Sequence, residues 1–185
     1  QVSTDEVYGS VASGRTNETA PLRPSSPYAA SKAAADAFAQ AYATTYGVPV
    51  TITRCCNNYG PYQFREKLIP LFLTNALAGE PLPVYGDGLQ VRDWIHVDDH
   101  CDAIWDLLGR EDAVGETYNV SAHEERTNRE VTALILRATG RPESLMRTVR
   151  DRPGHDRRYA LDATRLWATG WRPRWRFGGG LGGGA

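Results

Sequence analysis

The sequence predicts an α/β fold built on a parallel sheet, followed by a smaller lobe. A strand end at Val2–Ser3, an alanine-rich stretch from Tyr28 to Tyr46 and the β-branched run Val48–Arg54 succeed one another at the spacing of a parallel crossover. The 185 residues are also enough to bury a sizeable core. We therefore expect a helix to link two neighbouring parallel strands.

Local signals set the limits of this first crossover. Residues 4–9 follow the first strand and lie at its carboxyl edge, and residues 14–26 form a loop. Ser26 can cap the helix, Pro27 suits its first turn, and Gly47 stands where a helix commonly ends. The helix is expected to place Ala34, Phe38, Ala41 and Tyr42 on one stripe.

The remaining chain is predicted to alternate short helices and strands. We expect helices over Lys67–Ala78, Cys101–Leu108 and Arg129–Thr139, and strands over Pro81–Asp87, Arg92–Val97 and Glu116–Val120. Asp98, Asp99 and Thr127 are the expected helix caps, and Asn57–Pro61 the expected loop. No helix is expected over residues 177–185, because each interior glycine costs about 1 kcal/mol.

Composition narrows the class of protein. Basic and acidic residues nearly cancel, 21 against 22, which argues against a nucleic-acid partner. No apolar run approaches the ~18 residues of a membrane span. The three cysteines, Cys55, Cys56 and Cys101, lack metal-ligand spacing and indicate reduced, mostly buried thiols of a cytoplasmic protein.

One histidine pair could suggest a metal site. His96 and His100 stand beside Asp98 and Asp99. These side chains straddle the end of a strand and the start of a helix, so we interpret them as a strand end and a helix cap. No metal is expected.

The first 32 residues concentrate acid–base groups. Thr4, Asp5 and Glu6 follow the first strand, and Tyr28 and Lys32 open the first helix. Tyr28 and Lys32 are four residues apart and share one helix face, where a cation lowers the pKa of a phenol toward that of a general base. The pair alone is weak evidence, but its place opposite a strand's carboxyl end favours a site.

These residues resemble the extended short-chain dehydrogenase/reductase superfamily. Within it, the chain is similar to the dTDP-glucose 4,6-dehydratases over about residues 1–176, through residues 4–6, 57–63, 66–70, 91–94 and 151–159. The resemblance implies the C-terminal part of a Rossmann-type doubly wound parallel sheet over residues 1–60. A smaller lobe over 61–176 would mainly bind the nucleotide sugar, with some segments returning to the sheet, before a glycine-rich tail over 177–185.

The resemblance also implies a reaction with three stages: oxidation at C4 of the hexose by NAD, loss of water across C5 and C6, and return of hydride to C6. Tyr28 would take the C4 hydroxyl proton, with Lys32 lowering its pKa and Thr4 bonding the C4 oxygen. Glu6 would remove the C5 proton, and a protonated Asp5 would assist departure of the C6 hydroxyl. This requires the strand to have ended by Asp5, since adjacent strand residues face opposite ways.

Binding residues follow from the same resemblance. NAD would contact Tyr28, Lys32 and Asn58. The dTDP-glucose substrate would be held by Thr4, Asn57, Lys67, Leu68, Pro83, Val84, Tyr85, Arg92, Asn128, Asp151, Arg152, Pro153, Gly154 and His155. Arginine suits such a ligand because it pairs bidentately with phosphate.

Some expectations remain open. The chain lacks the glycine-rich strand–turn–helix that grips a dinucleotide, so the resemblance implies that most of the NAD-binding half precedes Gln1. The family is typically homodimeric at full length. The alternatives are a nucleotide-sugar 4-epimerase, a UDP-glucuronate decarboxylase, and a non-catalytic sugar-nucleotide-binding remnant.

Overall fold

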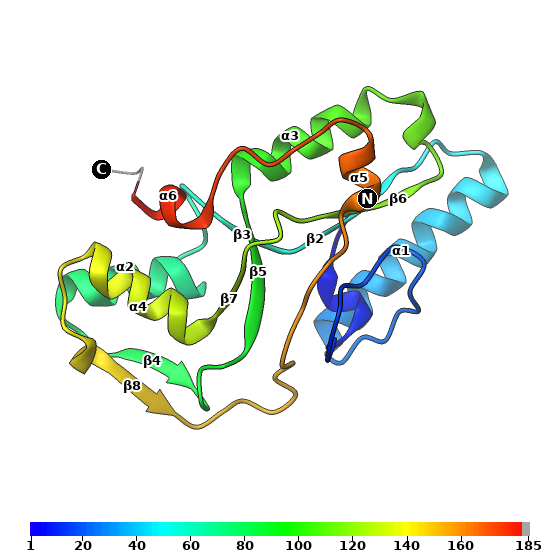
Figure 1. Cartoon of the computed structure of the whole chain (residues 1–185). Coiled ribbons are helices and arrows are strands. Elements are labelled where there is room, and N and C mark those ends of the chain that lie inside the picture. The colour runs from blue at the N-terminus through cyan, green and yellow to red at the C-terminus, as the bar shows by residue number, and fades with distance from the viewer. Residues whose placement is uncertain (183–185) are drawn as a thin grey trace.

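The computed structural model describes residues 1–182 and is built around a three-stranded parallel sheet. Strands β1 (Val2–Thr4), β2 (Ile52–Cys55) and β6 (Thr117–Val120) lie in the order β1-β2-β6 (Figure 1). The register pairs Thr4 with Cys55 and Cys55 with Val120. All three strands therefore end at one edge, as expected for a parallel α/β fold.

Helix α1 (Pro27–Tyr46) makes the crossover from β1 to β2. Its start is fixed by Ser26, whose Oγ accepts a hydrogen bond from the Ala29 amide at 3.1 Å. Its end is fixed by Gly47, which adopts the left-handed conformation with φ 67°. The predicted limits of this helix are confirmed, because both caps are local and use the residues that such caps favour.

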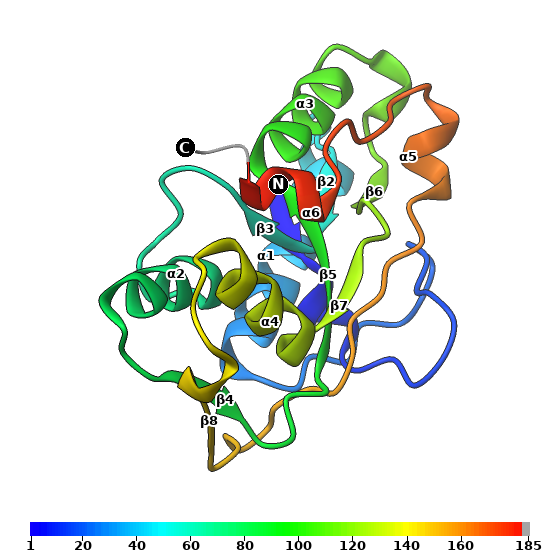
Figure 2. The same cartoon turned by 60° about the vertical axis from the view of Figure 1, so that its left-hand side comes forward.

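The remaining strands form two smaller sheets. The order β3-β5-β7 joins β3 (Asn57–Tyr59), β5 (Val91–His96) and β7 (Glu125–Thr127), and β4 (Leu82–Tyr85) pairs in parallel with β8 (Met146–Val149). The helices are α2 (Leu68–Ala78), α3 (Val97–Leu108), α4 (Asn128–Ala138), α5 (Thr164–Ala168) and α6 (Phe177–Gly182); short 3₁₀ turns η1, η2 and η3 cover Asp5–Tyr8, Glu111–Ala113 and Glu143–Leu145. Figure 2 shows α2, α4, β4 and β8 gathered in one lobe.

Several elements differ from the sequence-based expectation. The predicted loop at Asn57 begins strand β3, which pairs with β5 through the contact of Asn57 with Trp94. β7, β8 and α5 were not predicted, because each is only three to five residues long and its partner lies far away in sequence. Helix α3 is capped by His96 rather than by Asp98 or Asp99, which occupy its first turn.

The expectation that the glycine-rich end cannot form a helix is wrong for Phe177–Gly182, which is helix α6. Phe177 is buried and its ring lies 4.9 Å from that of Tyr59 and 5.5 Å from that of Trp94. Burial of a large aromatic side chain contributes enough to offset the low helix propensity of glycine. Residues 183–185 of the predicted tail lie outside the described residues.

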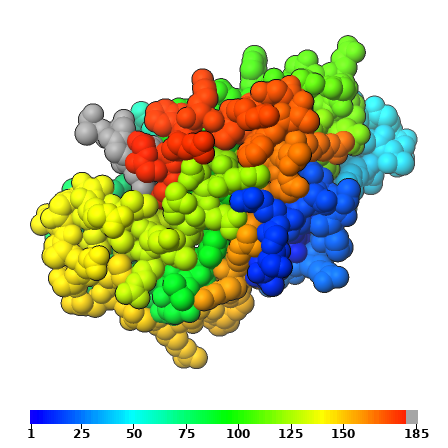
Figure 3. Space-filling model, in the orientation of Figure 1, coloured from blue at the N-terminus to red at the C-terminus, as the bar shows by residue number. Residues whose placement is uncertain are grey.

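Distant segments of the chain are brought together on one surface. In Figure 3 the N-terminal loop lies against the segment around residue 160, and backbone hydrogen bonds join Val11 to Arg158 and Thr16 to Ala160 at 2.9 Å each. Within residues 1–182, the helices are too short or too polar to cross a membrane.

A buried ion pair fastens α1 to the sheet. Arg54, in the middle strand, donates from Nε to Asp36 Oδ2 of α1 at 3.0 Å, and both side chains are at most 5% exposed. Arg54 also donates to the Tyr8 hydroxyl at 2.9 Å, and this hydroxyl donates to Asn119 Oδ1 at 2.9 Å. The network thus ties together α1, η1, β2 and β6.

We predict that Asp36→Ala destabilises the fold by about 3–5 kcal/mol, because it leaves the Arg54 guanidinium buried without a counter-charge. Urea denaturation measures the effect. Asp112→Ala is the matched control, since Asp112 pairs with Arg110 at the surface and its loss should change little. Equal effects of the two substitutions would contradict a structural role for the buried pair.

Candidate active site

The acid–base groups lie where β1 ends. β1 stops at Thr4 and η1 begins at Asp5, so the condition that the strand has ended by Asp5 is met. Thr4 Oγ1 accepts from the Glu6 amide at 3.3 Å and donates to Asp5 Oδ1 at 3.1 Å. The turn allows Asp5 and Glu6 to line the same cavity.

This cavity, the acid–base pocket, has a volume of ≈310 Å³. It brings together residues from the ends of β1 and β2, the start of α1 and the loop before α2. Its lining comprises Val2, Ser3, Thr4, Asp5, Glu6, Tyr28, Lys32, Cys55, Cys56, Asn57, Asn58, Gln63, Lys67 and His100. All five predicted catalytic residues are therefore in one place.

The two carboxyl groups have different environments. Burial, followed by the Cys55 thiol and the Glu6 carboxylate, raises the pKa of Asp5 well above its usual range. Burial also raises the pKa of Glu6, but Arg92, Lys67 and Arg152 oppose that rise. Asp5 is the group favoured to keep its proton, and Glu6 the group favoured to act as a base.

The hydrogen bonds of Asp5 agree with a protonated carboxyl group. Its Oδ1 accepts from Thr4. Its Oδ2 is buried and has no hydrogen-bond partner among residues 1–182. One oxygen is thus left free to carry a proton.

Tyr28 and Lys32 both line the acid–base pocket. Lys32 Nζ donates to the Val2 carbonyl at 2.6 Å, which attaches α1 to β1. The pKa of Tyr28 is raised by burial and then by the Glu6 and Asp5 carboxylates. The hydrogen bond of Lys32 thus goes to the backbone of β1, and the lowering of the Tyr28 pKa by Lys32 stays a prediction.

Asn57 and Asn58 face different surroundings. Asn57 lines both the acid–base pocket and the cationic pocket described next. Asn58 points its amide inward: Nδ2 donates to the Cys56 carbonyl at 3.3 Å, and Oδ1 is 2.9 Å from His100 Nδ1. Asn58 therefore joins the end of β2 to α3.

Cys55 and His100 are pocket residues that the sequence reasoning missed. Cys55 and Cys56 are buried free thiols, as expected, whereas Cys101 is exposed. Burial alone would raise the pKa of Cys55, but the Cys56 thiol and the His100 imidazole outweigh it and lower this pKa to about 6. His100 lies in α3, far from Cys55 along the chain, so the sequence did not indicate that the two side chains are neighbours.

A second cavity of ≈490 Å³, the cationic pocket, opens beside Glu6. Three cations line it: Lys67, Arg92 and Arg152. Arg92 is buried, its guanidinium stacks over the Tyr159 ring at 4.4 Å, and its Nη2 donates to the Asp156 carbonyl at 3.0 Å. The remaining lining is Glu6, Ser26, Tyr28, Asn57, Pro153, Gly154, Asp156 and Tyr159. A dianionic group fits such a cavity.

A third cavity of ≈250 Å³, the apolar pocket, adjoins the second through Arg152. Its lining includes the predicted residues Leu68, Pro83, Val84, Tyr85, Asn128, Arg152 and His155, with Glu66, Leu71 and Phe72 in addition. A flat ring fits between such apolar side chains.

Asp151 differs from the other predicted substrate residues because it acts on its neighbours. Its Oδ1 is 2.6 Å from His155 Nδ1, and its Oδ2 accepts from Gln90 at 2.9 Å. Asp151 therefore orients His155 beside the apolar pocket. Within residues 1–182, no cluster of three or more His, Cys, Asp or Glu side chains is arranged to hold a metal ion.

A parallel sheet with a hydroxyl, a carboxyl pair and a tyrosine–lysine helix at its carboxyl edge defines an extended short-chain dehydrogenase/reductase. A family model described as GDP-mannose 4,6 dehydratase matches residues 1–182. The chain belongs to this family of nucleotide-sugar dehydratases.

Relatives and solved structures agree with this assignment. The chain is 55% identical over 191 residues to the dTDP-glucose 4,6-dehydratase of Xanthomonas campestris, covering 97% of this chain and 54% of that protein. It is 51% identical to the low-salt glycan biosynthesis protein Agl12 of Haloferax volcanii, covering 98% and 58%. The chain thus spans about half the length of the curated relatives it matches.

Among solved structures, the chain is similar to the dTDP-glucose 4,6-dehydratase DesIV of Streptomyces venezuelae with NAD and TYD bound (TM-score 0.95, 54% identity, 98% of this chain and 56% of that one). It is also similar to a Thermus thermophilus UDP-glucose 4-epimerase in complex with NAD (TM-score 0.91, 35% identity, 98% and 60%). The higher identity lies with the dehydratase.

We predict that Asp5→Asn stabilises the fold at neutral pH, because burial raises the pKa of Asp5 and its ionisation then costs stability. Below about pH 3.9 the carboxyl group is protonated in the folded and the unfolded chain, and Asp5 has no effect. As the pH rises, the unfolded chain loses this proton first, because the folded-state pKa is raised. The stability cost of Asp5 therefore grows up to the folded-state pKa.

Thermal denaturation from acid to neutral pH measures this gain. The control is Asp112→Asn, since the Arg110 hydrogen bond holds the pKa of Asp112 below its usual range and no gain is expected. A pH-independent difference between Asp5→Asn and the parent chain would refute the assignment.

Proposed function

We propose that this chain carries the acid–base and substrate-binding parts of a dTDP-glucose 4,6-dehydratase, which converts dTDP-glucose to dTDP-4-keto-6-deoxyglucose. The observation that carries the proposal is the Asp5–Glu6 pair at the end of β1, whose two carboxyl groups line one cavity in different environments. Oxidation at C4 alone would need only Tyr28 and its neighbours. Elimination of water needs an acid and a base as well.

The residues present fit NAD as the cofactor. The acid–base pocket contains the Ser3 hydroxyl, which is buried and has no hydrogen-bond partner within residues 1–182, and the Lys32 ammonium beside Tyr28. Lys32, Tyr28 and Asn58 would hold the polar end of the cofactor. When bound, NAD supplies the oxidant that takes hydride from C4 and returns it to C6.

The residues of the chain would then move the protons. Tyr28 accepts the proton of the C4 hydroxyl while Thr4 orients the C4 oxygen. With a ketone at C4 the C5 proton becomes acidic, and Glu6 removes it. Asp5 donates its proton to the C6 hydroxyl, which leaves as water. The raised pKa of Asp5 supports this role, since an acid must enter the step protonated.

Substrate binding would use the two neighbouring cavities. Lys67, Arg92 and Arg152 match the charge of a diphosphate, and the apolar pocket suits a nucleobase. These cavities support a division in which residues 1–60 mainly serve the cofactor and residues 61–176 mainly bind the nucleotide sugar. They also favour one second candidate, a domain that binds nucleotide sugars without turnover, because both cavities are formed within this chain.

We predict that Asp5→Asn and Glu6→Gln each lower kcat for dTDP-glucose by about 10²–10⁴-fold, since each removes a proton-transfer group. Product formation with NAD is followed by NMR, and dTDP affinity by calorimetry is expected to be retained. Asp98→Asn, an exposed acid, is the control. Dehydration at the parent rate in both variants would exclude this mechanism, and conversion to a C4 epimer would favour the epimerase alternative.

We also propose a cytoplasmic homodimer. The proposal is supported by helix α1, which exposes the aromatic side chains Phe38, Tyr42 and Tyr46, each more than half exposed. We predict sedimentation as a dimer, and that Phe38→Glu with Tyr46→Glu shifts it to the monomer. A parent chain that sediments as a monomer at all concentrations would contradict the dimer.

A further inference from the structure

Asp156 connects two segments that border the cationic pocket. Its Oδ2 accepts hydrogen bonds from the Tyr159 hydroxyl at 2.5 Å and from the Ser25 hydroxyl. Tyr159 is buried beneath Arg92, whereas Ser25 belongs to the exposed loop directly before α1. One carboxylate thus bridges residues that are 134 positions apart (159 − 25).

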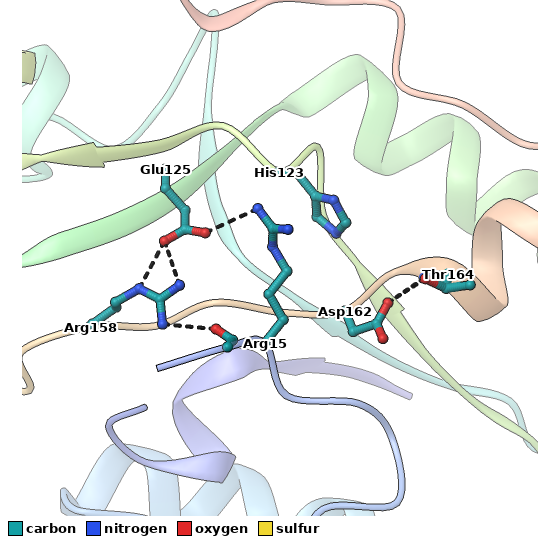
Figure 4. Close-up of a pocket in the computed structure, with 7 residues that line it drawn as sticks. Arg15, His123, Glu125, Arg158, Asp162 and Thr164 are labelled. Carbon is teal, nitrogen blue, oxygen red and sulfur yellow. Dashed lines mark hydrogen bonds and ion pairs between the residues drawn. The ribbon is translucent and has the colours of Figure 1, made fainter. Parts of the chain in front are cut away.

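The segment that carries Asp156 is anchored at both ends. At its start, Val149 pairs with Tyr85 in the β4–β8 sheet. At its end, Arg158 is bound by Glu125 at 2.8 Å and by the Gly14 carbonyl at 2.9 Å, beside a separate polar cavity of ≈500 Å³ (Figure 4). Between these anchors, residues 152–154 line the cationic pocket.

A second segment that lines this pocket, at the start of α1, contains Ser26 and Tyr28. Ser25 is the neighbour of Ser26, so the Ser25–Asp156 hydrogen bond joins the wall that carries Arg152 to the wall that carries Tyr28. We propose that Ser25, Asp156 and Tyr159 form a clasp that holds these two walls together and thereby sets the affinity for the nucleoside diphosphate. This inference rests on the proposed function, and it makes Asp156 a positioning residue.

The negative charge of Asp156 and its hydrogen bonds should affect the binding of an anionic ligand in opposite directions. A carboxylate beside the cationic pocket repels an anionic ligand and contributes to the raised pKa of Glu6. If Asp156 acted only through its charge, its neutralisation would tighten binding of a diphosphate. If it acts as a clasp, replacing the carboxylate with an amide leaves a weaker acceptor for both hydroxyl groups, which loosens the contact between the walls and weakens binding. The two roles have opposite signs.

The experiment measures the affinity of dTDP by calorimetry for the parent chain, Asp156→Asn, Ser25→Ala and the double variant. We expect each single variant to bind on the order of 5- to 10-fold more weakly, as for loss of a charge-assisted hydrogen bond. The double variant should lose less affinity than the two single effects added together, because both substitutions act on the same contact. Ser25→Thr keeps the hydroxyl and should bind as the parent does.

Asp87→Asn is the matched control, because it removes a nearby surface acid that pairs with Arg157 and leaves the clasp intact. It should bind dTDP as well as the parent or slightly better. If the parent binds dTDP and Asp156→Asn binds equally or more tightly, the clasp is overturned while the proposed function stands. A parent chain that fails to bind dTDP overturns both.

Discussion

The buried guanidinium of Arg54 is the interaction on which the rest of the structure depends. A charge in the middle strand of the sheet is costly unless it is paired and hydrogen-bonded. Arg54 is satisfied by Asp36 from α1 and by Tyr8 from η1, and Tyr8 in turn by Asn119 of β6. The charge of Arg54 is therefore compensated only when α1, η1, β2 and β6 are packed together as they are in this structure. The helix that bears Tyr28 and the turn that bears Asp5 are fixed by the same ion pair.

The site follows from this arrangement and from the parallel register. Because Thr4 pairs with Cys55, the ends of β1 and β2 lie side by side, and the chain after each strand enters one cavity. The turn at Asp5 then places a buried carboxyl group in the lining of this cavity. Burial raises the pKa of Asp5, while Lys67, Arg92 and Arg152 oppose such a rise for Glu6. Asp5 and Glu6 are adjacent in sequence but have different surroundings, which favours one as an acid and the other as a base.

The sequence was informative where the signals were local. Ser26, Pro27 and Gly47 defined α1, because caps depend on nearby atoms. The sequence was uninformative for β7 and β8, which are three or four residues long and pair with a distant strand. It was also uninformative for the glycine-rich helix α6, which is stabilised by the contact of Phe177 with distant aromatic side chains. In the site, the roles expected of Asp5 and Glu6 came from the resemblance to the 4,6-dehydratases, which rests on several motifs along the chain. The contacts of Lys32 with Val2, of Asn58 with His100 and of Asp156 with Ser25 are tertiary, so no spacing along the chain indicated them.

The central claim is that Asp5 is protonated in the folded chain at neutral pH. Infrared difference spectroscopy between the parent chain and Asp5→Asn tests it most directly, because only a protonated carboxyl group shows the carbonyl stretch of an acid. The account predicts a band of this kind in the parent that shifts in heavy water and is missing from Asp5→Asn. A difference spectrum that shows only loss of an ionised carboxylate would contradict it.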